Sequence, residues 1–407
     1  MTRIPCSKKY FLYLASCVLV LGASGAVRAK PDKTFRKAWE DLARDYRSML
    51  EEEGVVGSSL MFIQDGDVIA QEFYGMADIE ESRPVDANTI YHWASVTKTF
   101  TGIAVMQLRD RGLLDLDDPV IDYLPELKAV HNPYGDMRDI TIRHVMSHSA
   151  GFRNPTWPWG GDQPWHPFEP ARWELLVAMM PYTEILFEPG SRYSYSNPAI
   201  IFLGRIIEEL TGDDYEVYVE KNILRPLGMS MSYFDGTPYH LLKYRSNNYT
   251  VIDGKPQANG LDFDTGITVS NGGLNAPLAD MAGYLAFLIG EEGNPTYEGV
   301  LKRSSLEEMW RPVLPTEDAD ENIPEFEESI ALTFFVFENG DTRYIGHTGS
   351  QKSFRLFFYI QPETKTGVIA GFNTMGQAEE GEKPKPDTDA LLRVIRGRIF
   401  KGIFPMF

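Results

Sequence analysis

The order of secondary-structure patterns along the chain is the feature that most restricts how it can fold. A β-hairpin is predicted near the start, because Asp65-Gly66 stands between the β-rich runs 58–63 and 68–74. A long helical and loop-rich middle follows, and the last third returns to strands. These later strand patterns are 330–337, 342–346, 354–360 and 367–372. A single sheet that receives strands from both ends of the chain, with a helical subdomain inserted, explains this order.

Helical patterns accompany the strands throughout the chain. Amphipathic helices are predicted at 34–53, 200–210, 278–289 and 389–400. The expected fold class is therefore α/β in the α+β sense, with an antiparallel sheet flanked by helices. We assign the sheet subdomain to 30–94 together with 268–407, and the inserted helical subdomain to 95–267.

The segment 1–29 has the composition of a secretory signal peptide. Basic residues and no acidic residue surround an apolar run from Tyr10 to Val20, and the segment closes with Val27-Arg28-Ala29. We expect cleavage after Ala29 and a periplasmic or secreted product. A rival interpretation takes Cys17 as a lipoprotein cleavage site, which would anchor the protein to lipid. The apolar stretch continues past Cys17, and this favours the signal peptide.

Removal of this segment changes the chemistry open to the mature chain. Both cysteines, Cys6 and Cys17, lie in it, so disulfides, cysteine nucleophiles and cysteine metal sites are excluded. The formal net charge of −19 falls to about −23, because the lost segment is basic. Such a surface repels nucleic acid and anionic lipid, and no later apolar run approaches the ~18 residues that span a bilayer. We therefore expect no nucleic-acid partner and no stable membrane insertion.

Ser95 and Lys98 stand three residues apart at the start of a predicted helix that Gly112 ends. One helical turn places the lysine ammonium beside the serine hydroxyl. A serine becomes nucleophilic when a neighbour takes its proton, and a lysine in a partly dry cleft has a pKa low enough to help. Chance gives roughly one Ser-x-x-Lys in a chain of this length, so the interpretation depends on further partner residues.

Two patterns that suggest a metal site have simpler explanations. His144 and His148 are four residues apart, but the glutamate of a zinc-protease motif does not follow His144 and no third ligand is evident. The run Asp115 to Asp118 lacks the central glycine and the final glutamate of a calcium loop. The sequence also has no glycine-rich phosphate loop. We therefore expect neither a metal nor another cofactor.

Two further motifs follow the Ser-x-x-Lys, first Tyr195-Ser196-Asn197 and later His347-Thr348-Gly349. In this order the three motifs resemble those of the serine penicillin-recognising enzymes. The resemblance is to the branch that contains class C β-lactamases, D-alanyl-D-alanine carboxypeptidases, D-aminopeptidases and related esterases. The segments 148–152 and 271–274 are also similar to that family, so the likeness covers most of the mature chain. It implies the β-lactamase/transpeptidase-like fold.

The resemblance implies a role for each residue of the first two motifs. Ser95 is expected to be the nucleophile and Lys98 its proton partner. Tyr195 is expected to be a second base that passes the proton to the leaving group. Asn197 is expected to hydrogen-bond the Lys98 ammonium or the substrate amide. Tyr193 also precedes a serine, but only Tyr195 stands two residues before Asn197.

The third motif is expected to bind substrate. His347 occupies the position of a lysine in the β-lactamases, followed by Thr348 and Gly349. With an unperturbed pKa near 6.5, its imidazole attracts an anion less than a lysine does, while still donating a hydrogen bond to substrate or tyrosine. The backbone N–H groups of Ser95 and Ser350 are expected to form the oxyanion hole.

A literal Lys365-Thr366-Gly367 matches the β-lactamase version of the third motif. It follows Gln361 and Pro362, so it is interpreted as the far turn of a hairpin whose first strand starts soon after Gly349. At ~3.3 Å per residue, about a dozen residues of strand place it ~30 Å or more from His347. We therefore interpret this match as a coincidence.

These patterns together predict an exported serine hydrolase that forms an acyl-enzyme on Ser95. The expected substrate is an ester, a D-amino-acid peptide or a β-lactam-like amide. The sequence contains no Gly-x-Ser-x-Gly motif, which argues against an α/β-hydrolase. The alternative is a catalytically silent sensor of cell-wall peptides, which has no need of the complete Ser95, Lys98 and Tyr195 set. The sequence leaves open the substrate, the acyl acceptor and the oligomeric state. It also leaves open whether the Trp-rich loop 153–173 covers the site or is a rigidly packed surface loop.

Overall fold

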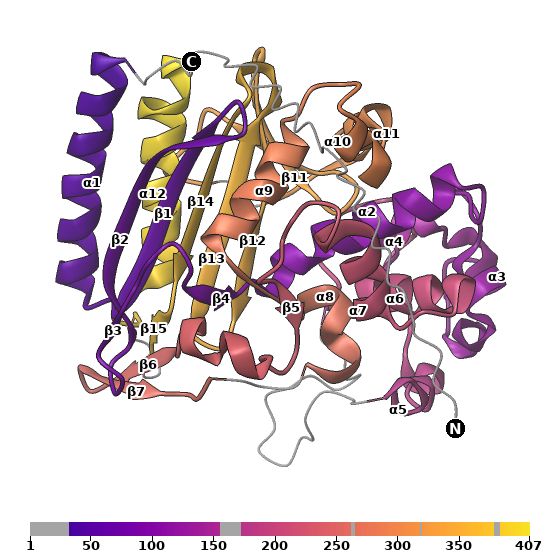
Figure 1. Ribbon diagram of the computed structural model, residues 1–407. Coiled ribbons are helices and arrows are strands. Elements are labelled where there is room, and N and C mark those ends of the chain that lie inside the picture. Colours follow the sequence, from indigo (N-terminus) through magenta and orange to yellow (C-terminus); the bar gives the residue numbers. More distant parts are fainter. Residues whose placement is uncertain (1–31, 155–171, 262–264, 318–319, 378–382) are drawn as a thin grey trace, which may run out of the picture.

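The computed structural model describes residues 32–154, 172–261, 265–317, 320–377 and 383–407. The predicted signal peptide and most of the Trp-rich loop lie outside these residues. A central sheet has the two terminal helices on one face and the other helices on the opposite face (Figure 1). The predicted fold class, an antiparallel sheet flanked by helices, is confirmed.

The central sheet is antiparallel throughout its nine strands. In order across the sheet they are β3 (Arg83–Pro84), β2 (Asp67–Asp78), β1 (Gly57–Gln64), β14 (Thr366–Phe372), β13 (Phe354–Gln361), β12 (Thr342–Gln351), β11 (Phe335–Asn339), β10 (Glu327–Ile330) and β9 (Leu314–Pro315). The pairing of β1 with β14 joins the two ends of the chain in one sheet, as the order of patterns predicted.

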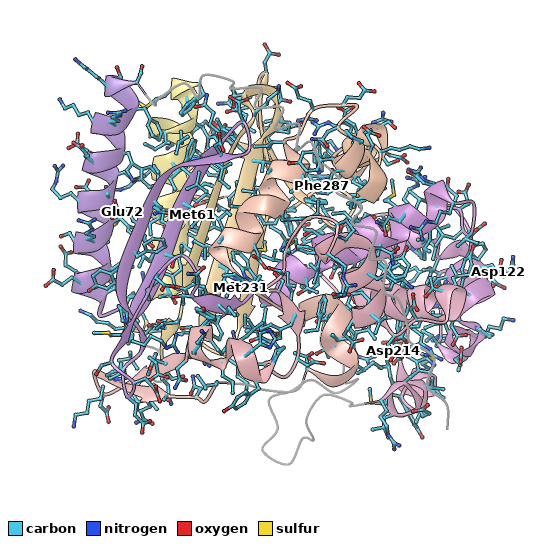
Figure 2. All side chains as sticks on the ribbon, viewed as in Figure 1. Met61, Glu72, Asp122, Asp214, Met231 and Phe287 are labelled. Atoms are coloured by element: carbon cyan, nitrogen blue, oxygen red, sulfur yellow. The ribbon has the colours of Figure 1, made fainter. Side chains whose placement is uncertain are left out.

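Each face of the sheet has its own core, because successive side chains of a strand point to opposite faces. Leu60 and Phe62 of β1 pack toward α1 (Lys33–Glu53) and α12 (Thr388–Gly402). Met61, from the same strand, belongs to the core on the other face together with Phe287 of α9 (Leu278–Leu288) (Figure 2). Because β1 is buried on both faces, its second half, Leu60–Ile63, is continuously apolar instead of alternating.

On the α9 side of the sheet, α2 (Thr97–Asp110) lies in the middle of the helical region. It packs against α6 (Asn197–Thr211) and α8 (Val269–Gly272). Residues Thr97–Leu108 of α2 are buried on every side, as expected of a helix in the centre of a core. The remaining helices are α3 (Val120–Tyr123), α4 (Ile142–Met146), α5 (Trp173–Val177), α7 (Tyr215–Val219), α10 (Pro295–Val300) and α11 (Arg303–Met309). None of the helices in the described part of the chain has the length and apolar content of a membrane span.

Two small sheets connect the helical region to the central sheet. One consists of β4 (Ile90–His92), β8 (Leu274–Pro277) and β5 (Tyr233–Phe234), and the other of β15 (Thr374–Gly376), β6 (Tyr249–Ile252) and β7 (Lys255–Ala258). β5, β6 and β7 lie within the predicted helical subdomain, and β6 pairs with β15 from the end of the chain. The subdomain limits at 94/95 and 267/268 stay a prediction.

Two predicted strands differ from the structure. The pattern 330–337 is divided between β10 and β11 by a turn in which Thr333 has φ +62° and Ala331 N donates to Phe334 O. The pattern 342–346 continues as β12 to Gln351. The third motif therefore lies inside a strand, where pairing with β13 fixes its position.

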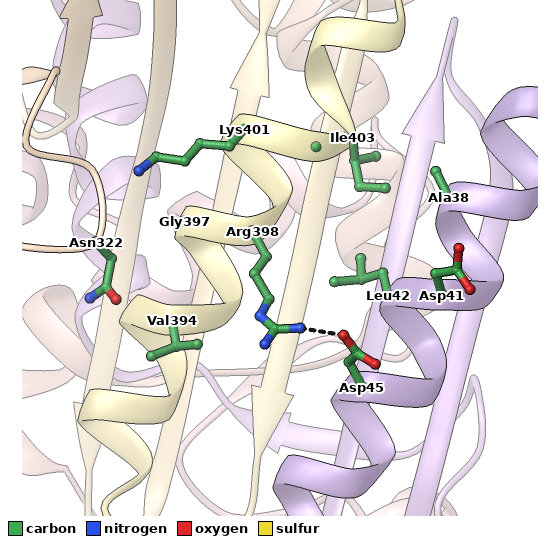
Figure 3. A pocket seen from close by; sticks show the side chains of 11 residues that line it. Ala38, Asp41, Leu42, Asp45, Asn322, Val394, Gly397, Arg398, Lys401 and Ile403 are labelled. Carbon is green, nitrogen blue, oxygen red and sulfur yellow. Dashed lines mark hydrogen bonds and ion pairs between the residues drawn. The ribbon is translucent and has the colours of Figure 1, made fainter.

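A pocket of about 520 Å³ lies between α1 and α12 (Figure 3). Arg398 of α12 donates a hydrogen bond to Asp45 of α1 across it, at 2.6 Å. Its walls consist of charged, amide and aliphatic residues with no serine, tyrosine or histidine, so it has no group suited to acyl transfer.

Candidate active site

Ser95 lies in a single 3₁₀ turn, Ala94–Val96, directly before α2. Ala94 has φ +46°, a left-handed conformation that is unfavourable for a residue with a side chain. Two hydrogen bonds from Trp93 to β8 hold this turn, one from its backbone N to Leu274 O at 2.7 Å and one from its indole Nε1 to Ala276 O at 2.8 Å. Such strain persists where the surroundings hold the backbone firmly.

Lys98 follows one turn later and its side chain is fully buried. Its Nζ lies 3.0 Å from Ser95 Oγ and donates to Asn271 O at 2.8 Å. Burial lowers the pKa of Lys98 well below its usual value, because the ammonium loses its hydration. The neutral amine thus becomes accessible, and it can accept the Ser95 proton while still donating to Asn271.

Tyr195 comes just before α6, whose first turn is capped by Ser196 Oγ accepting from Ala199 N. Lys98 Nζ lies 4.9 Å from the centre of the Tyr195 ring. Burial raises the pKa of the Tyr195 hydroxyl, and its hydrogen bond with Ser95 opposes that shift only in part. Tyr195 therefore keeps its proton at neutral pH, in contact with the predicted nucleophile.

Gly349 allows β12 to lie directly against the nucleophile turn. A Cβ at this position would lie 2.2 Å from Trp93 O, much closer than any side chain tolerates. This approach brings Ser350 into the pocket that also contains Ser95. The glycine of the third motif is thus explained by close packing of two backbones.

His347 is buried, and its ring lies 5.1 Å from that of Phe335. Its Nδ1 is 2.5 Å from Thr348 O. Because a carbonyl oxygen only accepts, Nδ1 carries the proton and Nε2 presents a lone pair. Burial, together with the charge of Lys98, lowers the pKa of His347 to about 3, so its imidazole is neutral. Nδ1 thus donates to the backbone, and the predicted hydrogen bond from His347 to substrate or tyrosine stays a prediction.

The side chain of Asn197 does not make the predicted hydrogen bond with Lys98, which was one of two contacts expected of it. Its Nδ2 donates to Asn154 Oδ1 at 3.3 Å, while Asn271 O receives the hydrogen bond from Lys98. Asn197 still lines the pocket, so its contact with a substrate amide stays a prediction. Asn271 has no side-chain signal for this role, because its backbone oxygen is the acceptor.

One pocket of about 390 Å³ is lined by most of the predicted site residues, while Lys98 and Gly349 lie behind its wall. Six predicted site residues contribute to it, namely Ser95, Tyr195, Asn197, His347, Thr348 and Ser350. The rings of Tyr193 and Phe335, which meet edge to face at 6.1 Å, form an aromatic wall. The described residues thus bring a nucleophile, proton partners and an aromatic surface together.

The two histidines considered as metal ligands have structural contacts. His144 Nδ1 accepts from Thr141 N at 3.3 Å, and His148 Nδ1 accepts from Ser196 N at 3.1 Å. Within the described ranges, no group of three or more metal-ligating side chains occurs.

Lys365 lies in the turn before β14 and pairs with Glu291. It lines a different pocket from Ser95. The predicted separation of ~30 Å from His347 is too large, because His347 pairs with Phe358 and β13 ends three residues later at Gln361. At ~3.3 Å per residue, the strand from Phe358, opposite His347, to the end of β13 at Gln361 is about 10 Å long.

Comparison with known proteins places this geometry in context. The family model described as Beta-lactamase matches residues 33–392. Protein flp of Staphylococcus aureus (strain COL) is 24% identical over 324 residues, which cover 79% of this chain and 60% of that protein. The chain thus spans less than two thirds of the length of this relative.

Two solved structures have similar folds. The penicillin-binding protein homologue from Pyrococcus abyssi has a TM-score of 0.70 and 27% identity, covering 89% of this chain and 81% of that one. A class C beta-lactamase has a TM-score of 0.70 and 18% identity, covering 90% of this chain and 96% of that one.

Proposed function

Because the chain belongs to the beta-lactamase family of serine hydrolases, we propose that it is an exported enzyme that forms an acyl-enzyme on Ser95. The observation that carries the proposal is the buried Lys98 Nζ, 3.0 Å from Ser95 Oγ and above the Tyr195 ring. A buried amine beside a hydroxyl is suited to proton transfer, and a hydroxyl alone is not. Export is inferred from the signal-peptide pattern of residues 1–29.

Acylation follows from the protonation states of the site. Neutral Lys98 takes the Ser95 proton as Oγ attacks the substrate carbonyl carbon. The oxyanion accepts hydrogen bonds from the N–H groups of Ser95 and Ser350, each worth about 2.7–4 kcal/mol of barrier in such sites. Tyr195 then donates its proton to the leaving oxygen or nitrogen as the bond to the acyl carbon breaks, and Lys98 returns a proton to Tyr195. Water or an amine then attacks the acyl carbon of the ester on Ser95 and gives up a proton to Lys98. As the bond from the acyl carbon to Ser95 Oγ breaks, Lys98 returns that proton to Oγ, which restores the free enzyme and releases the acyl product.

The walls of the pocket favour uncharged acyl donors. His347 is neutral, and Tyr193 and Phe335 add apolar surface. Two charged residues, Glu328 and Arg396, also line the pocket, but their charges are of opposite sign and the Arg396 guanidinium is paired with Asp320. A substrate carboxylate meets no lysine at the third motif, where β-lactamases place one. We therefore propose that short-chain esters and D-residue peptides are hydrolysed faster than β-lactams, which act mostly as slow acylators. Faster turnover of nitrocefin than of p-nitrophenyl esters and D-peptides alike would overturn this preference.

Labelling with a fluorophosphonate, followed by peptide mass spectrometry, tests the acyl-enzyme. The wild type is expected to carry the label on Ser95, while Ser95→Ala and Lys98→Ala are not labelled, since the two residues act as a unit. A label on Ser149, Ser196 or Ser350 instead contradicts the assignment. A wild type that binds peptides without labelling or turnover supports the silent sensor.

A further inference from the structure

His148 is held in a strained conformation next to the site. It follows the end of α4 with φ +51°, in the left-handed region that few non-glycine residues adopt and in which Asn, Asp and His are the commonest of them. Its side chain is 1% exposed, and it lies outside the set of described residues that line the active-site pocket. Residues in such conformations cluster at functional sites, so the position of this buried histidine suggests a function there.

The contacts of His148 are centred on Tyr195. Its backbone O accepts from Ser194 N at 2.8 Å, and its Nδ1 accepts from Ser196 N at 3.1 Å. The residues immediately before and after Tyr195 are therefore both bonded to this one histidine. In addition, its ring stacks on the Tyr195 ring, with centroids 4.4 Å apart and an angle of 26° between the planes.

The protonation of the ring is determined by these bonds. A backbone N–H only donates, so Nδ1 presents its lone pair to Ser196 and Nε2 carries the proton. Within the described residues, Nε2 is buried and has no hydrogen-bond partner. Burial and the nearby charge of Lys98 lower the pKa of His148, which agrees with a neutral ring. Since Nδ1 is occupied and Nε2 is enclosed, His148 has no free nitrogen for proton transfer with substrate.

We propose that His148 is a positioning residue, which fixes the Tyr195 hydroxyl at the place where it donates a proton to the leaving group. The proposal rests on the proposed function, in which Tyr195 performs that transfer. The unpaired Nε2–H of His148 and its left-handed backbone both disfavour the folded state. The three contacts that His148 makes with residues 194–196 offset this cost.

The role predicts a dependence on the leaving group. Ethyl butyrate and p-nitrophenyl butyrate give the same acyl-enzyme, but only the strongly basic ethoxide needs a proton as it departs. Displacement of Tyr195 by about 1 Å is expected to lower kcat/KM for ethyl butyrate about 10²-fold. The value for p-nitrophenyl butyrate is expected to change much less. A merely structural role lowers both values by the same factor, through the fraction of folded enzyme.

Two substitutions separate the contacts of His148. His148→Asn retains tolerance of positive φ, and its Oδ1 takes the place of Nδ1 as acceptor for Ser196 N. His148→Phe retains a ring to stack on Tyr195 but has no acceptor. The bonded backbone fixes position more strictly than stacking, so His148→Asn is expected to rescue most of the ethyl butyrate activity that His148→Phe loses.

A matched control is available on the same segment. The ring of His144 also accepts a backbone N–H, but from Thr141 within its own helix cap. His144→Phe is therefore expected to leave the ratio of the two kcat/KM values unchanged, whereas His148→Phe changes it. In a Tyr195→Phe background the proton donor is absent, and His148→Phe is expected to have no further effect on that ratio.

The outcomes separate this inference from the proposed function. Equal losses on the two esters in His148→Asn and His148→Phe, or an effect that persists without the Tyr195 hydroxyl, overturn the positioning role. Absence of fluorophosphonate labelling in the wild type overturns the proposed function instead. Thermal unfolding of each variant reports whether it folds. If His148→Phe does not fold, His148→Ala, which also lacks an acceptor for Ser196 N, takes its place and is expected to lose ethyl butyrate activity selectively.

Discussion

Substitution of Gly349 by alanine tests whether contact between β12 and the nucleophile turn creates the site. The new Cβ would lie 2.2 Å from Trp93 O, whereas such contacts are essentially never shorter than 3.0 Å. The two backbones must therefore separate by about 0.8 Å or more, which moves Ser350 away from Ser95. A misplacement of about 1 Å costs about 10² in rate, so we expect acylation to fall by about that factor.

The assay is the rate of fluorophosphonate labelling of Ser95, measured beside thermal unfolding. Gly57→Ala is a matched control, because its Cβ would also lie 2.2 Å from a backbone oxygen, that of Met76 in β2. Gly57 is in β1 and does not line the active-site pocket of the described residues. Both variants are expected to lose stability, and only Gly349→Ala to lose labelling per folded molecule. Labelling of Gly349→Ala at the wild-type rate, or an equal loss in Gly57→Ala, refutes the reasoning.

Further predictions concern the active site and the signal peptide. Tyr195→Phe is expected to lower turnover by about 10²- to 10⁴-fold with the fold intact, and a harmless Tyr195→Phe beside a damaging Tyr193→Phe would move the motif by two residues. His347→Lys is expected to shift relative kcat/KM toward carboxylate-bearing esters, and an unchanged ratio argues against a substrate contact. The buried His347, with a pKa of about 3, stays neutral while the unfolded chain binds a proton below pH 6.5. Its contribution to stability is therefore lost as pH falls from 6.5 toward 3, by at most about 1.4 kcal/mol per pH unit. When the free energy of unfolding is measured with urea at a series of pH values, it is expected to fall less steeply with falling pH in His347→Asn than in the wild type. The N-terminus of the exported protein is expected to be Lys30, whereas a lipidated Cys17 would contradict cleavage after Ala29.

Elements with a strong local signal could be predicted from the sequence. Asp65 and Gly66 both have positive φ, as the predicted Asp-Gly hairpin turn requires, and β1 and β2 flank them. The break at Thr333 was missed because apolar residues continue on both sides of it. The position of the third motif within β12 depends on the hairpin pairing with β13 and also on packing against Trp93, which is a long-range contact. Sequence spacing cannot report such contacts.

The candidate site could be predicted where side-chain chemistry marks it, and was incomplete elsewhere. Ser95, Lys98 and Tyr195 carry reactive groups in a recognisable order. Asn271 contributes a backbone oxygen, which any residue has, so no residue type indicates it. His148 was considered only as a metal ligand, because its spacing from His144 is visible in the sequence and its contacts with 194–196 are not. Its signal in the sequence is its place in the segment 148–152, which resembles the family.

Burial is the common physical cause of the protonation states that the proposed chemistry needs. It lowers the pKa of Lys98, raises that of Tyr195 and lowers that of His347, and each shift favours the neutral form. A protonated His347 and a protonated Lys98 would repel each other, so the proximity of the two groups also disfavours the charged form of His347. The pocket at neutral pH therefore offers a proton acceptor and a proton donor with little net charge. Such a site attracts a carboxylate weakly and retains the ability to move a proton, and this combination suits uncharged esters and amides.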